Sequence, residues 1–155
     1  LVNNKLTMSK RNQHIATLEK LLTNLRNAKL EYLKAADRAL VSEDKRFFNQ
    51  QAMIRNRFFQ EILIELQSLG TSYDDLVVSR FNFDQLLISS IDHLKASAIE
   101  KCLEADKLLL DLYRTLFDQE FENSKLLQHL SSIEVALDQS QVIATEHRHK
   151  KEVNS

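Results

Sequence analysis

The chain of 155 residues contains no proline and a single glycine, Gly70. Because these two residue types form most tight turns and interrupt helices, their near absence removes the usual local signals for a β-rich fold. Long helices joined by short connections are the structure that such a sequence favours. The length suits one domain with its own core, and no stretch reads as a linker between two domains.

Apolar residues recur at helical spacing in four segments of the chain. The first two predict helices over about residues 10–40 and 43–69. Ser42 is the expected N-cap of the second helix, and two acidic residues follow it where the helix dipole favours negative charge. Gly70 stands where a left-handed residue commonly ends a helix. The two segments should form a helical hairpin.

The second half of the chain predicts another hairpin after a longer connection. Residues 71–91 are turn-like at first and then suggest a short extra helix across the end of the bundle. Asp92 is the expected cap of a third helix over 92–117, and a fourth helix is expected over 121–147. The fold class is therefore all-α: an antiparallel, ferritin-like four-helix bundle of two hairpins joined by a longer crossover.

The two ends of the chain are expected to lie outside this bundle of residues 10–147. Met8-Ser9-Lys10 looks like a natural start, so residues 1–9 are interpreted as a disordered or expression-derived extension. Residues 148–155 are predicted to form a polar tail, because charged and polar residues dominate there and termini fray readily.

Charge and cysteine content narrow the class of protein. Lys and Arg number 21 and Asp and Glu number 22, so the formal net charge is -1 and no basic field exists to attract nucleic acid or a membrane surface. The one cysteine, Cys102, cannot form an internal disulfide, and its place on an apolar stripe favours packing over nucleophilic chemistry. Without an evident membrane span or signal peptide, we expect a cytoplasmic protein.

Several short packing motifs carry a resemblance to a known family. They are spread over the first three predicted helices: Tyr32-Leu33-Lys34-Ala35-Ala36, Ala52, Arg55, Phe59-Gln60-Glu61-Ile62-Leu63, Leu69-Gly70, Cys102, Ala105-Asp106 and Tyr113-Arg114. Over about residues 15–146 the chain resembles an uncharacterised bacterial family of four-helix bundles, a domain of unknown function in the ferritin-like superfamily. The resemblance implies the fold and, loosely, a stress-related role, but no activity.

The ligand pattern of a di-iron bundle is missing from the predicted helix interiors. Such bundles use a Glu from each of two helices and a Glu-x-x-His pair from each of the other two. The only Glu-x-x-His here joins Glu146 to His149 at the end of the fourth helix, so we expect no metal and no cofactor. With His93, these residues form a weak candidate end cluster for zinc or nickel, although a solvated histidine-rich tail is the simpler interpretation.

A polar layer is predicted where a di-iron protein collects its carboxylates. Folding each hairpin about its turn sets Lys29 beside Arg55 and Asp106 beside Glu134. We interpret the four as a salt-bridged structural layer, since buried charges persist only when paired. Two alternatives stay open: the charges lie on the flanks of the helix seams, or Asp106, Glu134 and Glu104 form a degenerate metal site.

The remaining features favour a role through protein contacts. The phenylalanines at positions 47, 48, 58, 59, 81 and 83 exceed what one helix face can bury, so part of them predicts self-association, most simply as a dimer. No catalytic triad or phosphate-binding loop can be proposed. We expect a non-enzymatic protein with an unidentified protein partner. A divergent metal-binding or oxidase protein, and a scaffold that binds an amphipathic helix, are the alternatives.

Overall fold

A computed structural model of the chain describes residues 2–72 and 97–154, with side chains over 8–72 and 97–146. Within these ranges the chain forms four α-helices and no strand: α1 (Val2–Arg38), α2 (Ser42–Ser68), α5 (Ala98–Asp118) and α6 (Ser124–Asn154). The all-α prediction is confirmed. The short helix expected within 71–91, and the expected cap at residue 92, lie outside the described residues.

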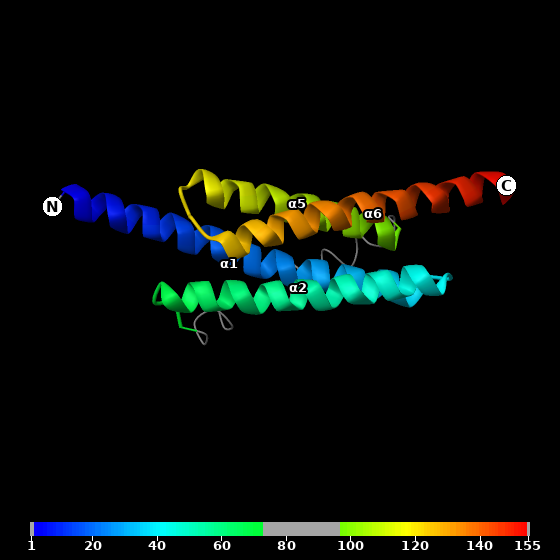
Figure 1. The fold of residues 1–155 in the computed structure, drawn as a ribbon, viewed down its shortest axis with the longest axis horizontal. Coiled ribbons are helices and arrows are strands. Elements are labelled where there is room, and N and C mark those ends of the chain that lie inside the picture. The colour runs from blue at the N-terminus through cyan, green and yellow to red at the C-terminus, as the bar shows by residue number, and fades with distance from the viewer. Residues whose placement is uncertain (1, 73–96, 155) are drawn as a thin grey trace.

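The four helices lie side by side along one long axis (Figure 1). α1 packs against α2 and α5, α5 packs against α6, and α6 reaches α2 over a short stretch. Arg11, early in α1, donates a hydrogen bond to the Leu69 carbonyl just past the end of α2. Tyr32, late in α1, makes an edge contact with Phe47 near the start of α2. These two contacts connect both ends of α1 to α2.

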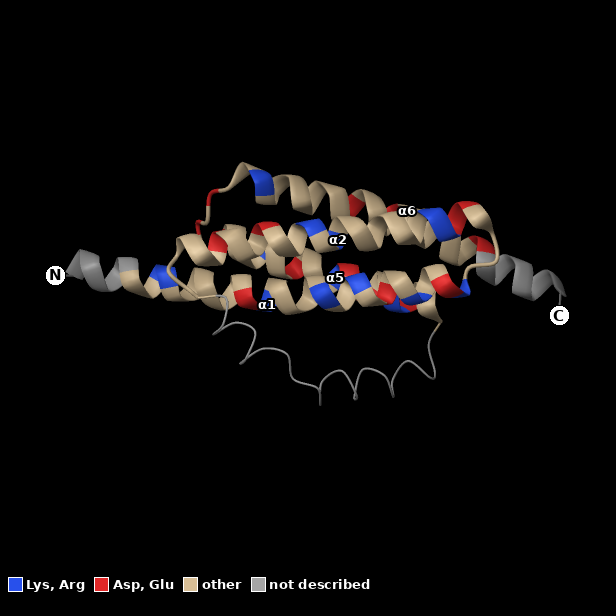
Figure 2. Ribbon diagram, turned by 90° about the horizontal axis from the view of Figure 1, so that it is seen from below, with Lys and Arg blue, Asp and Glu red and all other residues tan. Residues whose placement is uncertain are grey.

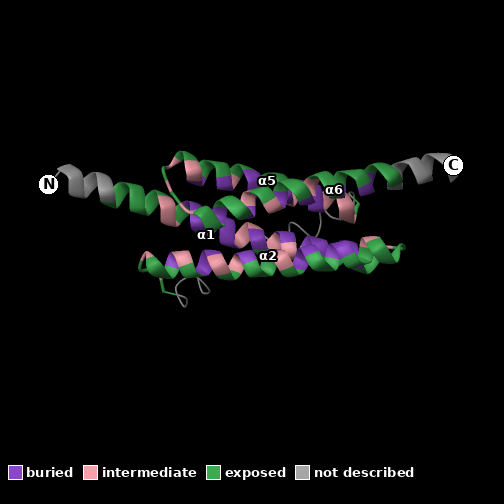
Figure 3. Ribbon diagram, in the orientation of Figure 1, coloured by how far each residue is buried: buried purple, intermediate pink, exposed green. Residues whose placement is uncertain are grey.

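Buried side chains line the inward face of each described helix (Figure 3). One apolar cluster joins leucines of α1 to Phe58, Ile62 and Leu66 of α2 and to residues of α5 and α6. A second cluster surrounds Tyr32 and includes Phe47 and Phe48. Phe59 packs against the first cluster, so the four described phenylalanines of the predicted surplus contribute to the interior. Phe81 and Phe83 lie outside the described residues.

Both terminal helices are longer than the sequence predicted. α1 begins at Val2 rather than near residue 10, and α6 continues to Asn154 rather than ending near 147. The expected extension over 1–9 and the expected tail over 148–155 are therefore helical between those bounds. Neither segment contains glycine or proline, so nothing local stops a helix that the bundle has already nucleated.

The helix caps are partly those expected. Gly70 has a φ of +93° and closes α2 as predicted. Ser42 is not an N-cap: the cap position is Val41, without a side-chain hydrogen bond, and Ser42 lies in the first turn. The hydroxyl of Ser97 caps α5 by accepting from the Glu100 amide at 3.2 Å. Capping by Asn123 starts α6 three residues later than the predicted position 121.

Charge is mixed along the described helices, with Lys and Arg interspersed among Asp and Glu (Figure 2). This mixture agrees with the formal net charge of -1. None of the described helices has a stretch both long enough and apolar enough to cross a membrane.

Candidate functional site

A buried ion pair joins α2 to α5 through the centre of the bundle. The side chains of Arg55 and Asp106 are both 0% exposed. Nη2 of Arg55 donates to Oδ1 and Oδ2 of Asp106 at 3.1 and 3.0 Å, and Nε donates to Oδ1 at 3.2 Å. Such forked pairing of guanidinium and carboxylate is directional as well as strong.

Three further side chains, Tyr32, Gln51 and Ser140, complete this cluster. We call these five residues, Arg55 and Asp106 included, the four-helix node. Tyr32 of α1 donates its hydroxyl to Oδ2 of Asp106, and its oxygen lies 3.2 Å from Oγ of Ser140 on α6. Gln51 accepts from Nη1 of Arg55 at 3.0 Å. The guanidinium carbon also lies 5.0 Å from the centre of the Tyr32 ring, within cation–π range. Every described helix thus contributes to one hydrogen-bonded cluster.

The charges of Arg55 and Asp106 are stable in the interior because each is paired with the other. Burial raises the pKa of the Asp106 carboxyl from its ordinary value, while the charge and hydrogen bonds of Arg55 oppose that shift. Burial likewise raises the pKa of Tyr32, which remains a neutral hydroxyl donor. A buried charge that loses its partner is costly. A metal ion at Asp106 would have to displace Arg55 first.

The predicted polar layer is thus divided by the structure. Arg55 and Asp106 lie in it, but Lys29 is half-buried at its edge and donates to Oδ1 of Asn56 at 3.1 Å. The long aliphatic part of a lysine allows its ammonium to reach the surface from such a position. The prediction that Lys29 shares the central layer is therefore wrong.

Glu134 was also misplaced by the sequence pattern. Its side chain is 49% exposed and lies 3.5 Å from Nη2 of Arg114 on the surface. Because α6 begins three residues later than predicted, the position opposite Asp106 is shifted along α6 toward Ser140, which reaches the node through Tyr32. Serine supplies a small hydroxyl there in place of a second carboxylate.

A second buried cluster, the histidine node, consists of Glu61, Tyr113 and His129. His129 of α6 is 1% exposed. Its Nδ1 lies 2.8 Å from the Tyr113 hydroxyl on α5, and its Nε2 lies 2.6 Å from Oε2 of Glu61 on α2. The ring stacks on Phe58 with centroids 3.8 Å apart. This one imidazole therefore contacts both α2 and α5.

The hydrogen bonds define which ring nitrogen carries the proton. Glu61 is an acceptor when ionised, so Nε2–H donates to it and Nδ1 accepts from the Tyr113 hydroxyl. Burial lowers the pKa of His129 below its ordinary value, although Glu61 acts in the opposite direction. The neutral imidazole satisfies both of its partners. Burial also raises the pKa of Tyr113 and keeps its hydroxyl protonated.

Sequence reasoning missed the histidine node because α6 carries two competing apolar stripes. One stripe runs through Leu127 and Leu130, yet Leu127 is 52% exposed. Leu126 and Ile133 are fully buried instead. His129 comes three residues after Leu126 and four residues before Ile133, so it lies on the same face of α6 as these two residues. That spacing was the sequence signal for a buried histidine.

The weak metal candidates do not gather in the part of the chain that the structure describes. No three His, Cys, Asp or Glu side chains there lie close enough to hold a metal ion. Glu104 pairs with Lys101 at 3.2 Å on the surface of α5. Glu146 is exposed, whereas residue 93 and the side chain at 149 lie outside the description. Cys102 is a free, fully buried thiol whose pKa is raised by burial.

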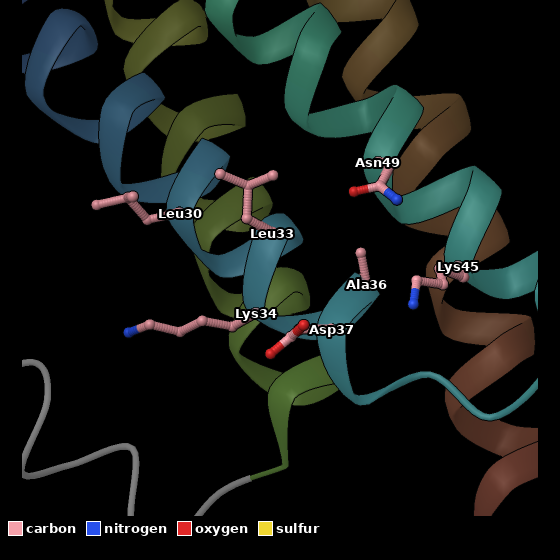
Figure 4. A pocket seen from close by; sticks show the side chains of 7 residues that line it. All are labelled: Leu30, Leu33, Lys34, Ala36, Asp37, Lys45 and Asn49. Atoms are coloured by element: carbon pink, nitrogen blue, oxygen red, sulfur yellow. The ribbon is translucent and has the colours of Figure 1, made fainter.

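An open hollow lies on the surface between α1 and α2 (Figure 4). Its volume is about 370 Å³. Its lining combines three apolar residues with two lysines, an aspartate and an asparagine: Leu30, Leu33, Lys34, Ala36, Asp37, Lys45 and Asn49. We call it the α1–α2 groove. Comparison of the chain with protein-family profiles, curated proteins and solved structures finds no match.

Proposed function

We propose that the protein is a non-enzymatic, ferritin-like bundle of antiparallel helices that acts through contacts with other proteins. The observation that carries this proposal is the ion pair of Arg55 and Asp106. The guanidinium occupies both carboxylate oxygens in the centre of the bundle, where a di-iron protein would present its carboxylates to metal. Arg55 and Asp106 are thus bound to each other rather than available to a ligand. We therefore assign the function to the surface of the bundle.

The contacts at the two ends of the bundle support the antiparallel arrangement. The start of α1 meets the end of α2 through Arg11 and Leu69. Tyr113, late in α5, meets His129, early in α6. Two such hairpins, joined by the 29 residues between α2 and α5, are the connectivity expected of this class of bundle.

A metal-binding or oxidase protein with a degenerate site is the alternative that this proposal opposes. The full chain, purified without an affinity tag, should contain no stoichiometric iron, zinc or nickel by elemental analysis. Its melting temperature should be unchanged by added iron(II) or zinc, because a ligand that binds the native state would raise it. Stoichiometric metal that raises the melting temperature, and that is lost in Asp106→Asn, would overturn the proposal.

A scaffold role is a second candidate, and the α1–α2 groove favours it. Two lysines flank its leucines, so the complementary occupant is an amphipathic helix whose apolar residues are accompanied by carboxylates. Leu33→Asp should abolish capture of such a helix-bearing partner. Leu108→Asp is the matched control, because Leu108 is a 55% exposed leucine on α5. Equal capture by both variants would rule out the groove.

Self-association is the remaining part of the proposal. A dimer would give the protein a partner in a second copy of itself, and sedimentation of the full chain over a range of concentrations would detect it. A monomer at every concentration would contradict this part while leaving a heterologous partner open.

A further inference from the structure

One side chain of α6, His129, makes polar contacts with both α2 and α5. α6 packs closely on α5 but meets α2 only over a short stretch. His129 stands in that stretch, where it stacks on Phe58 and donates to Glu61, both of α2. Its other nitrogen accepts from Tyr113 of α5. An imidazole, the side chain that titrates nearest neutral pH, therefore stands beside the apolar contacts of Leu126 and Ile133 in the attachment of the first half of α6.

Addition of a second proton to this ring conflicts with its surroundings. A proton on Nδ1 would point at the Tyr113 hydroxyl, which already directs its own proton along the same 2.8 Å contact. Tyr113 is 0% exposed, and among the described residues its hydroxyl has His129 as its hydrogen-bond partner, so a hydroxyl turned away from His129 would lose that bond. A buried donor without an acceptor is costly.

Charges around the ring do not remove this conflict. Glu61 on α2 favours the protonated ring, but Arg57 lies 3.8 Å from the same carboxylate and opposes it, as does Lys125 on α6. Burial, Arg57 and Lys125 together hold the pKa of His129 below its ordinary value in the docked helix, against the opposite effect of Glu61. If α6 leaves, the exposed ring recovers its ordinary pKa. Between the two values the undocked state binds more protons, so acidification favours undocking.

We propose that His129 is an acid-sensitive latch: uptake of one solvent proton by its ring releases the first half of α6 from α2 and α5. Release would expose Phe58, Leu126 and Ile133, which the docked helix keeps buried. The latch would convert mild acidification into an apolar surface available to a partner. It stands independently of the proposed partner function, because it concerns only the docking of α6.

Hydrogen exchange of the full chain between about pH 8 and pH 5 tests the latch. After correction for the intrinsic rates, amides of α6 around His129 should open up to about tenfold more per pH unit below the ordinary histidine pKa. Amides of α1 and α2 should not change. His129→Gln, which keeps an amide donor but cannot titrate in this range, should remove the pH dependence of opening.

Two further variants keep the test decisive. His14→Gln is the matched control, because His14 is half-buried and contacts the Gln119 carbonyl and the Phe121 ring, neither of which belongs to the histidine node; it should behave like the native chain. Tyr113→Phe removes the conflicting hydroxyl and should weaken the pH dependence even if His129→Gln folds poorly. Equal acid opening in the native chain and Tyr113→Phe, or acid opening that begins in α1, would overturn the proposal.

Discussion

Loss of Arg55 should be among the most destabilising single changes in the chain. Arg55→Met removes three hydrogen bonds to Asp106 and leaves a fully buried carboxylate without its cation. Breaking a buried ion pair from one side typically costs about 3–5 kcal/mol. That is a large share of the roughly 5–15 kcal/mol that stabilises a domain. Asp106→Asn leaves the buried guanidinium of Arg55 without its carboxylate, so it should lower the free energy of unfolding by a similar amount.

The double variant separates the buried charge from the rest of the side chains. With both changes present neither position is charged. Gln51 has lost its donor, and the amide that replaces the Asp106 carboxylate brings an NH2 group that needs an acceptor, at roughly 1–3 kcal/mol for each unsatisfied group. The double variant should therefore fall short of the sum of the single variants by roughly 2 kcal/mol or more. The exposed pair Arg114 and Glu134 is the matched control, for which Arg114→Met and Glu134→Gln should couple by well under about 1 kcal/mol.

Urea unfolding followed by far-ultraviolet circular dichroism gives each free energy of unfolding in the same buffer. If a single variant at the node is already unfolded, a folded double variant still demonstrates the coupling. The reasoning would be refuted by single variants that each cost less than about 1 kcal/mol, or by a double variant whose cost equals their sum within the error of about 0.5 kcal/mol.

Three smaller predictions follow from other parts of the bundle. Cys102 should resist alkylation in the native chain and react only on unfolding, because burial removes both access and the thiolate; rapid native labelling would contradict this. Gly70→Ala should lower stability by about 1–2 kcal/mol, since φ is +93° and an added Cβ would lie 2.8 Å from a terminal nitrogen of Arg11; thermal unfolding would measure the loss. Asn123→Ala should cost about 1 kcal/mol by removing the cap of α6, whereas an unchanged melting temperature would show that the cap is dispensable.

The helical period placed Arg55 and Asp106 in one layer of the bundle, but it set them beside Lys29 and Glu134 rather than beside each other. Arg55 stands between Gln51 and Phe58 of one stripe, and Asp106 stands between Cys102 and Leu109 of another. Each charge is therefore surrounded in sequence by residues that must face inward. What the pattern could not decide was whether a long side chain at such a position turns in or out, which is why Lys29 was assigned wrongly.

The errors in α6 have a different cause. Its two apolar stripes are about equally strong in the sequence, so periodicity alone does not choose between them. The N-cap decides, because it fixes where the helix starts and hence which residues meet α5. Asn123 followed by Ser124 was a recognisable start signal. A helix that starts at Ser124 places Leu126 and His129, rather than Glu134, on the inward face of α6.

The two buried nodes together predict where acid release of α6 should stop. His129 holds the first half of α6 through a ring that can take up a proton. Ser140 holds the second half through a contact between two hydroxyl groups, its own and that of Tyr32, in which no imidazole takes part. Amides beyond residue 140 should consequently stay protected at a pH that opens those near 129. Release of the entire helix at once would show that Ser140 does not retain it.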